Sequence, residues 1–259
     1  MIVDALAHAT EDGKWFETGR DASVAALLAS MDEHGVERAV LAGMHGHAEL
    51  DFLARTAAKH PGRFIPVAGL DLSMGLNTAA RTIAQAEEMG FAGVKIYPRM
   101  SGVPLTDPLI EEVVDLAGEA DLAAFVCTIH RPPLPPLGRP VSDAIHQLCA
   151  VCDSTRIVLV HGGYDDLLAT SERIRPMEHV LLDLSLTLTR FAKASVGLDI
   201  AFLLESFDRR ICVGTDFPET SWGDVLRAFE KIGVSKGELA GAGVLGENLL
   251  RFLAPAEED

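Results

Sequence analysis

The stretch Arg210-Ile211-Cys212-Val213-Gly214-Thr215-Asp216-Phe217-Pro218 decides the fold, because an apolar strand ends there on a carboxylate, directly before a turn-forming Phe-Pro pair. A second apolar stretch at the other end of the sequence, Met1-Ile2-Val3-Asp4-Ala5-Leu6-Ala7-His8, also ends on a polar side chain. In a barrel of parallel strands, such residues lie at the mouth, where these folds do their chemistry, and not in the packed interior. The two stretches therefore predict barrel strands with His8 and Asp216 at the mouth.

Short apolar, β-branched runs recur along the chain, with starts roughly 30 residues apart, the room that one strand, one helix and two loops occupy. The eight runs are Ile2 to Leu6, Ala39 to Ala42, Phe64 to Ala68, Gly93 to Tyr97, Ala123 to Thr128, Arg156 to His161, Val180 to Leu184 and Arg210 to Thr215. Between them, apolar residues follow helical spacing, as in Val24, Leu27, Leu28 and Met31. Eight such alternations predict an α/β protein, a single (β/α)8 TIM barrel over residues 1-259.

Composition and charge exclude several classes of partner. The chain has 259 residues, of which 48% are hydrophobic and 23% charged, as expected for one large α/β domain. Its 22 Lys and Arg against 38 Asp and Glu give a formal charge of -16, which repels nucleic-acid phosphates and anionic lipid. No apolar run is long enough to span a bilayer and no signal peptide is evident, so we expect a cytoplasmic protein. The sequence is compatible with a homo-oligomer.

The four cysteines lie on apolar segments, and a reducing compartment leaves them as thiols; they are Cys127, Cys149, Cys152 and Cys212. Cys149-Ala150-Val151-Cys152 has the spacing of a redox or zinc pair, but no second pair accompanies it. Its apolar neighbours follow helical spacing, so we interpret this segment as a buried helix face.

Two loops stand out. Residues 130-140 follow the fifth strand and hold five of the thirteen prolines, which predicts either a rigid wall at the mouth or a proline-rich surface turn. Gly43-Met44-His45-Gly46-His47 follows the second strand, and its two histidines are candidate metal ligands. Polar loops often carry histidines without such a role, which is the interpretation we favour here.

Polar residues also end or interrupt the apolar strands. They are His8 on the first, Lys95 on the fourth, Cys127 and Thr128 on the fifth, His161 on the sixth and Asp216 on the eighth. An unpaired charge inside an apolar strand costs several kcal/mol, so these groups are expected to meet one another, water or a metal. Their convergence predicts an active site at the barrel mouth, although Cys127 could be a small core residue and Lys95 could pair with Asp183 or Asp216.

Several motifs give the chain a family resemblance. Gly214-Thr215-Asp216-Phe217-Pro218 and the closing Gly246-Glu247-Asn248-Leu249-Leu250-Arg251-Phe252 resemble the amidohydrolase superfamily, with support from Val160-His161-Gly162-Gly163 and Gly93-Val94-Lys95. The similar branch includes aminocarboxymuconate-semialdehyde decarboxylase, γ-resorcylate decarboxylase and pyrone-dicarboxylate lactonase. The resemblance implies a divalent metal held by histidines of the first and of the fifth or sixth strand and by the aspartate of the eighth. That metal activates water or polarises a substrate oxygen, and the aspartate shuttles the proton.

The chain departs from this pattern at the metal site. Leu6 replaces the first histidine of the family's Asp-x-His-x-His opening, and we expect it to add apolar surface at the mouth. Cys127 stands where relatives have a histidine, and Lys95 where binuclear relatives bridge two metals with a carboxylated lysine. A remaining site would use His8, His161, Asp216 and Cys127, most plausibly for zinc, which accepts these ligands together.

Three hypotheses follow. The first and favoured one is a hydrolase that cleaves an ester, lactone or amide, metal-free or with one weakly held divalent metal; Lys95, His8 and His161 polarise a carbonyl and Asp216 activates water. The second is a true metalloenzyme, with non-oxidative decarboxylation as the alternative reaction. The third is a ligand-binding barrel without turnover. Arginines at a mouth suit a carboxylated small molecule, so the candidate substrate contacts, unless solvated, are Arg99, His130, Arg131 and Trp222.

Overall fold

The protein is described by a computed structural model, which places residues 1–207 and 210–254. All eight predicted strands form, with ends that differ from the prediction by three residues at most. They are β1 (Val3–Ala7), β2 (Arg38–Ala42), β3 (Phe64–Gly69), β4 (Gly93–Ile96), β5 (Ala123–Cys127), β6 (Ile157–Val160), β7 (Val180–Asp183) and β8 (Ile211–Cys212). Each strand pairs in parallel with the next, in the order β1 to β8. The predicted (β/α)8 TIM barrel is confirmed.

Backbone hydrogen bonds between β1 and the segment after β8 close the sheet into a barrel. The Ala5 amide donates to the Val213 carbonyl (3.2 Å), and the Asp216 amide donates to the Leu6 carbonyl (2.8 Å). Gly214 permits this approach, because a Cβ there would lie 2.4 Å from the Leu6 nitrogen. Closure therefore brings the two stretches that end on His8 and Asp216 side by side, although they lie at opposite ends of the sequence.

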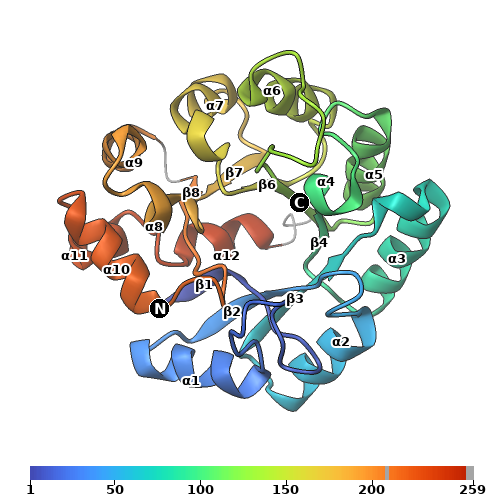
Figure 1. Cartoon of the computed structure of the whole chain (residues 1–259), viewed down its shortest axis with the longest axis horizontal. Helices are drawn as coiled ribbons and strands as arrows, with labels where there is room; N and C mark the ends of the chain where they lie inside the picture. The colour runs from blue at the N-terminus through green and yellow to red at the C-terminus, as the bar shows by residue number, and fades with distance from the viewer. Residues whose placement is uncertain (208–209, 255–259) are drawn as a thin grey trace, which may run out of the picture.

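A ring of helices surrounds the strands (Figure 1). The ring and its connections contain α1 (Val24–His34), α2 (Leu50–Lys59), α3 (Leu76–Glu88), α4 (Pro98–Ser101), α5 (Pro108–Glu119), α6 (Val141–Val151), α7 (Leu167–Ile174), α8 (Thr187–Phe191), α9 (Ser195–Ser206), α10 (Trp222–Lys231), α11 (Lys236–Gly241), α12 (Glu247–Leu253) and the 3-10 turns Leu72–Met74 and Tyr164–Asp166. Within residues 1–207 and 210–254, no helix combines the length and apolar character needed to cross a membrane.

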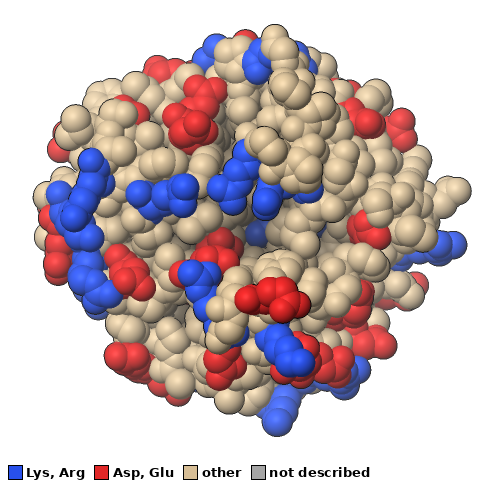
Figure 2. Space-filling model, viewed as in Figure 1, with Lys and Arg blue, Asp and Glu red and all other residues tan. Residues whose placement is uncertain are grey.

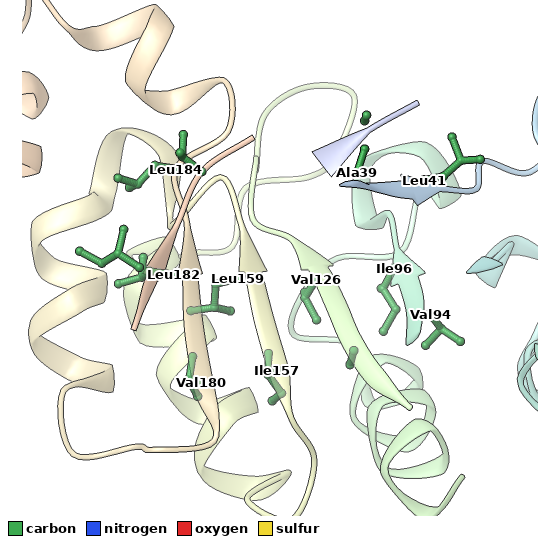
Figure 3. Close-up of a cluster of buried hydrophobic side chains, with 14 of the residues drawn as sticks. Ala39, Leu41, Val94, Ile96, Val126, Ile157, Leu159, Val180, Leu182 and Leu184 are labelled. Carbon is green, nitrogen blue, oxygen red and sulfur yellow. The ribbon is translucent and has the colours of Figure 1, made fainter. Parts of the chain in front are cut away.

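The strands bury both faces, which explains their continuous apolar runs. Outward side chains such as Leu41, Ile96 and Leu182 pack against the helices in one cluster (Figure 3). Inward side chains, among them Val40 and Phe125, form a second cluster inside the barrel. The closing motif forms α12, which packs on the inner cluster through Leu249, and the Asn248 amide donates to the Ile211 carbonyl (2.9 Å).

Leu6 belongs to this inner cluster and is fully buried, so the expectation that it adds apolar surface at the mouth is wrong. The register of β1 against β2 shifts between Asp4 and Ala7, and the Leu6 amide donates to Asp4 Oδ1 (3.1 Å). The leucine thus fills the packed layer inside the barrel, and His8, two residues later, is the residue of this pair that lines the cavity at the mouth.

Asp4 joins three parts of the chain. Besides the Leu6 amide, its carboxylate accepts hydrogen bonds from the Thr215 amide (2.9 Å), the Thr215 hydroxyl (2.7 Å) and Trp222 Nε1 (2.9 Å). Ser221 and Asp224 form a capping box that starts α10 at Trp222, whose side chain is buried. Trp222 lies outside the cavity lining, so its predicted contact with substrate is not supported.

We expect Asp4→Ala to lower the free energy of unfolding by about 3 kcal/mol or more, because the Thr215 and Trp222 donors would stay buried without an acceptor. Urea unfolding followed by circular dichroism measures the change. Asp51→Ala, at an exposed position of α2, is the control and should stay within about 0.5 kcal/mol of the parent. Equal unfolding midpoints for Asp4→Ala and the parent would show that this network contributes nothing to stability.

Candidate active site

A cavity of about 480 Å³ opens at the carboxyl ends of the strands. His8, Lys95, Cys127, His161 and Asp216 all line it, so the structure brings together five of the six side chains that the strand ends predicted. The sixth, Thr128, is buried outside the lining, and its hydroxyl donates to the Val160 carbonyl (2.7 Å). Figure 2 shows the hollow near the centre of this face, with Lys and Arg side chains along its rim. Its size suits a small organic molecule. The role of each residue stays a prediction.

Backbone strain concentrates around this cavity. Positive φ angles occur at five of its lining residues that are not glycine: Phe16 (48°), His161 (69°), Tyr164 (60°), Leu186 (61°) and Asp216 (52°). Such conformations cost on the order of 1–3 kcal/mol each and cluster at functional sites, where the surrounding structure enforces them. The strain at His161 and Asp216 supports a functional rather than a packing role for both.

His8 and Asp216 form a close pair. His8 Nδ1 donates to the Ala42 carbonyl (2.8 Å), and Nε2 lies 3.4 Å from Asp216 Oδ1. Burial lowers the pKa of His8, while its contact with Asp216 acts in the opposite direction. Burial alone would raise the pKa of Asp216, but the His8 contact and the charge on His161 hold it well below its usual value. Two acceptors facing each other can share one proton taken from water.

His161 and Cys127 form a second pair. The His161 Nδ1–H donates to the Ser185 carbonyl (2.7 Å), which leaves Nε2 available to Cys127 at the end of the neighbouring strand, where Cys127 lies opposite Val160. Burial opposes charge on both groups, but their contact raises the pKa of His161 to about 9 and lowers the pKa of Cys127. The contact therefore works against burial and favours charge on both groups.

Lys95 is fully buried on the cavity floor, and its Nζ has no hydrogen-bond partner among the described residues. The ammonium lies 4.7 Å from the centre of the Tyr97 ring. Burial lowers its pKa, while the charges of Asp216 and Cys127 act in the opposite direction. The ion pair with Asp183 is not formed as a hydrogen bond; that carboxylate instead accepts from the Ser185 amide (3.0 Å) and hydroxyl (2.6 Å). Lys95 thus keeps its donors free for a ligand.

The remaining predicted contacts divide into two groups. Arg99 and Arg131 line the cavity, and Arg99 Nε also donates to the Pro132 carbonyl (3.3 Å), which ties the proline-rich loop to the rim. His130 is outside the lining, and its Nε2 bonds to the Pro135 carbonyl (2.8 Å) within that loop, so the predicted substrate contact of His130 is not supported. His45 lies in a separate surface depression beside Glu49 and Asp71.

Sequence reasoning missed several cavity residues. Trp15 stacks on His8 with ring centres 5.3 Å apart, and its Nε1 donates to Glu219 (2.6 Å). Arg190 follows β7 and lies over the Tyr164 ring at 5.9 Å. Tyr97, directly after β4, offered a signal as an aromatic residue at a strand end. Trp15 offered none, because only folding brings its loop back over the mouth.

The residues do not fit a divalent metal. Among residues 1–207 and 210–254, no three His, Cys, Asp or Glu side chains are arranged to hold one. The Lys95 ammonium lines the same cavity and would repel a cation.

We expect removal of divalent metal to leave the protein folded. Protein dialysed against a chelator should keep its melting temperature within about 1 °C, because no group of described side chains is held together by a metal. Elemental analysis and thermal melts before and after dialysis measure this. One tightly held equivalent of zinc with His8, His161 and Asp216 as ligands, lost only on unfolding, would restore the metalloenzyme hypothesis.

Comparisons with known proteins agree with the barrel and with the motifs. The family model described as amidohydrolase matches residues 3–251. No curated protein sequence matches the chain significantly. Among solved structures, an uncharacterised TIM-barrel protein from Bordetella bronchiseptica has a TM-score of 0.81 at 14% identity, and the match covers 97% of this chain and 98% of that one.

Two further structures carry functional names. A probable 2-pyrone-4,6-dicarboxylic acid hydrolase from Acinetobacter baumannii, with citric acid bound, has a TM-score of 0.68 at 16% identity, with 97% and 98% of the two chains covered. A dihydroxybenzoic acid decarboxylase from Polaromonas sp. JS666, with bound manganese and 2-nitroresorcinol, has a TM-score of 0.66 at 18% identity, with 97% and 96% covered. At these identities the structures establish the shared fold. The family model spans nearly the whole sequence, and the chain is a member of the amidohydrolase family.

Proposed function

We propose that this chain hydrolyses an ester, lactone or amide of a small carboxylated molecule without a bound metal. One observation carries the proposal: a buried, unpartnered lysine ammonium and an acid–base pair line the same cavity. A buried polar group without a partner is rare in folded proteins, and a ligand is its simplest explanation. Lys95 would then donate to the oxygen of the bound carbonyl.

The cavity supplies the groups that carbonyl hydrolysis requires. Lys95 and the protonated His161 would stabilise the negative charge that develops on the carbonyl oxygen. Asp216 and His8 would accept the proton of the attacking water, since their facing acceptors can share it. The positive φ at His161 and Asp216 fixes both side chains before substrate arrives.

The arginine side chains at the rim of the cavity support the proposal that the substrate carries a carboxylate. Arg99, Arg131 and Arg190 line the cavity of a chain whose formal charge is -16, and Figure 2 shows Lys and Arg side chains along the rim of the hollow. Guanidinium groups bind carboxylates with two parallel hydrogen bonds. The hydrolase neighbour contains citric acid, and a decarboxylase neighbour contains 2,6-dihydroxybenzoate, both of which carry carboxylates.

Decarboxylation is the second candidate, because several structural neighbours are decarboxylases. One of them contains manganese. The described residues of this chain lack a comparable group of ligands, and a decarboxylase needs no activated water, so the Asp216–His8 pair favours hydrolysis.

A panel of small lactones and aryl esters, with and without a carboxylate, tests the proposal. We expect turnover in the presence of chelator, with preference for the carboxylated members. Arg131→Gln should raise KM for those members about three- to tenfold with little change in kcat. The reason is that an arginine at the rim binds the substrate carboxylate equally strongly in the ground state and in the transition state. Arg139→Gln, on the same loop but outside the cavity lining, is the matched control. Tight binding of a panel member without any turnover would favour the ligand-binding barrel.

A further inference from the structure

The four cysteines differ sharply in their surroundings. Cys149, Cys152 and Cys212 are buried in the packed clusters, and burial raises the pKa of all three, that of Cys149 to about 12. Cys127 alone among them lines the cavity. Of the four thiols, only that of Cys127, at the end of β5, is therefore available to a ligand in the cavity.

A chain of hydrogen bonds orients the histidine beside this thiol. The Asp183 carboxylate accepts from the amide and hydroxyl of Ser185, and the Ser185 carbonyl accepts from His161 Nδ1 (2.7 Å). The Thr187 hydroxyl donates to the His161 carbonyl (2.7 Å), which fixes the strained backbone. Because Nδ1 carries a proton, Nε2 is the atom that can take and return the proton of the Cys127 thiol.

We propose that Cys127 is a nucleophile that attacks the substrate carbonyl and forms a thioester, with His161 as its acid–base partner and Lys95 as the donor to the oxyanion. This inference rests on the proposed hydrolysis, since it names the first attacking atom of that reaction. A positioned histidine with a third group behind it is the arrangement that nucleophilic cysteines use on unrelated folds. Cys127 ends β5 opposite Val160 of β6, directly before His161, so the two side chains line the cavity from neighbouring strands.

The steps balance without any further reactant. The Cys127 sulfur forms a bond to the carbonyl carbon, and the carbonyl π pair moves to the oxygen beside Lys95. That pair returns, the bond to the leaving oxygen or nitrogen breaks, and the leaving group takes the proton from His161 Nε2. Water then attacks the thioester, Asp216 and His8 accept one of its protons, and the carbon–sulfur bond breaks to release the acid and restore the thiolate. The proton held by the Asp216–His8 pair then returns to His161, which completes the cycle.

Iodoacetamide tests the nucleophile independently of any substrate. At about pH 6, intact protein should be alkylated once, at Cys127 by peptide mass mapping, about tenfold faster in the parent than in His161→Gln. Both proteins offer the same access to the cavity, so the ratio reports activation of the thiol. Equal alkylation rates in the two proteins would overturn the proposal.

The acyl intermediate is tested with the esters of the panel. Cys127→Ala should lose at least about a hundredfold in turnover with an unchanged melting temperature, whereas Cys149→Ala keeps the parent rate. Asp216→Asn should accumulate an acyl adduct on Cys127, seen by intact mass, because attack of water on the thioester is slowed. Turnover by Cys127→Ala near the parent rate would overturn the inference and leave the proposed hydrolysis standing. If the parent hydrolyses nothing, the proposed hydrolysis fails, and the alkylation ratio alone supports or overturns a nucleophilic Cys127.

Discussion

Asp216→Asn is expected to lower turnover by about two to four orders of magnitude, the usual loss when a general base is removed. The amide has nearly the shape of the carboxylate but cannot accept a proton from water, so the pair with His8 no longer functions. The parent and variant are compared on the best ester or lactone of the panel, with initial rates at saturating substrate.

The matched control is Asp165→Asn, the same substitution at an exposed position, which should keep the parent rate. The melting temperature of Asp216→Asn should stay close to that of the parent. A loss of turnover at an unchanged melting temperature shows that the substitution affects the reaction and not the folded structure. Undiminished turnover by Asp216→Asn would remove Asp216 from the mechanism. If a panel member binds the parent and the variant equally well and neither turns it over, the ligand-binding barrel is the better account.

Lys95→Met is expected to lower turnover by about two to three orders of magnitude while it raises stability. Loss of one donor to a developing oxyanion has an effect of this size. Methionine keeps the length and apolar body of the side chain and removes a buried charge that has no hydrogen-bond partner, so unfolding should become harder by about 1–3 kcal/mol.

The opposite signs of these two effects make the test specific. A structural lysine would lower stability when removed, whereas a functional one held in an unfavourable environment raises it. Rates on the panel and urea unfolding of the same preparations give both values. A variant that loses stability together with activity would contradict the role of Lys95 as a free donor to substrate.

Much of the fold could be predicted because it depends on local pattern. Eight apolar runs with helical segments between them define parallel strands that are buried on both faces, and the structure confirms each of them. The two stretches that end on His8 and Asp216, near opposite ends of the sequence, predicted that the first and last strands lie side by side. The positions of His8, Lys95, Cys127, His161 and Asp216 followed from the rule that strand ends meet at one edge.

The errors have physical causes that a sequence pattern does not reveal. Leu6 was expected at the mouth, but a register shift in β1 places it in the inner cluster. Trp222 was expected to contact substrate, but the capping box of Ser221 and Asp224 starts a helix there, and the buried ring donates to Asp4. Trp15 could not be found, because its place over His8 depends on the path of a long loop.

The central claim is that water, and no metal, cleaves the substrate at this cavity. The most direct test is turnover of the best panel member by chelator-treated protein in water labelled with heavy oxygen, followed by mass spectrometry of the products. We predict that one labelled oxygen enters the carboxylate of the product and that no carbon dioxide is released. Release of carbon dioxide with an unlabelled product, or turnover that returns only when manganese or zinc is added, would contradict the account.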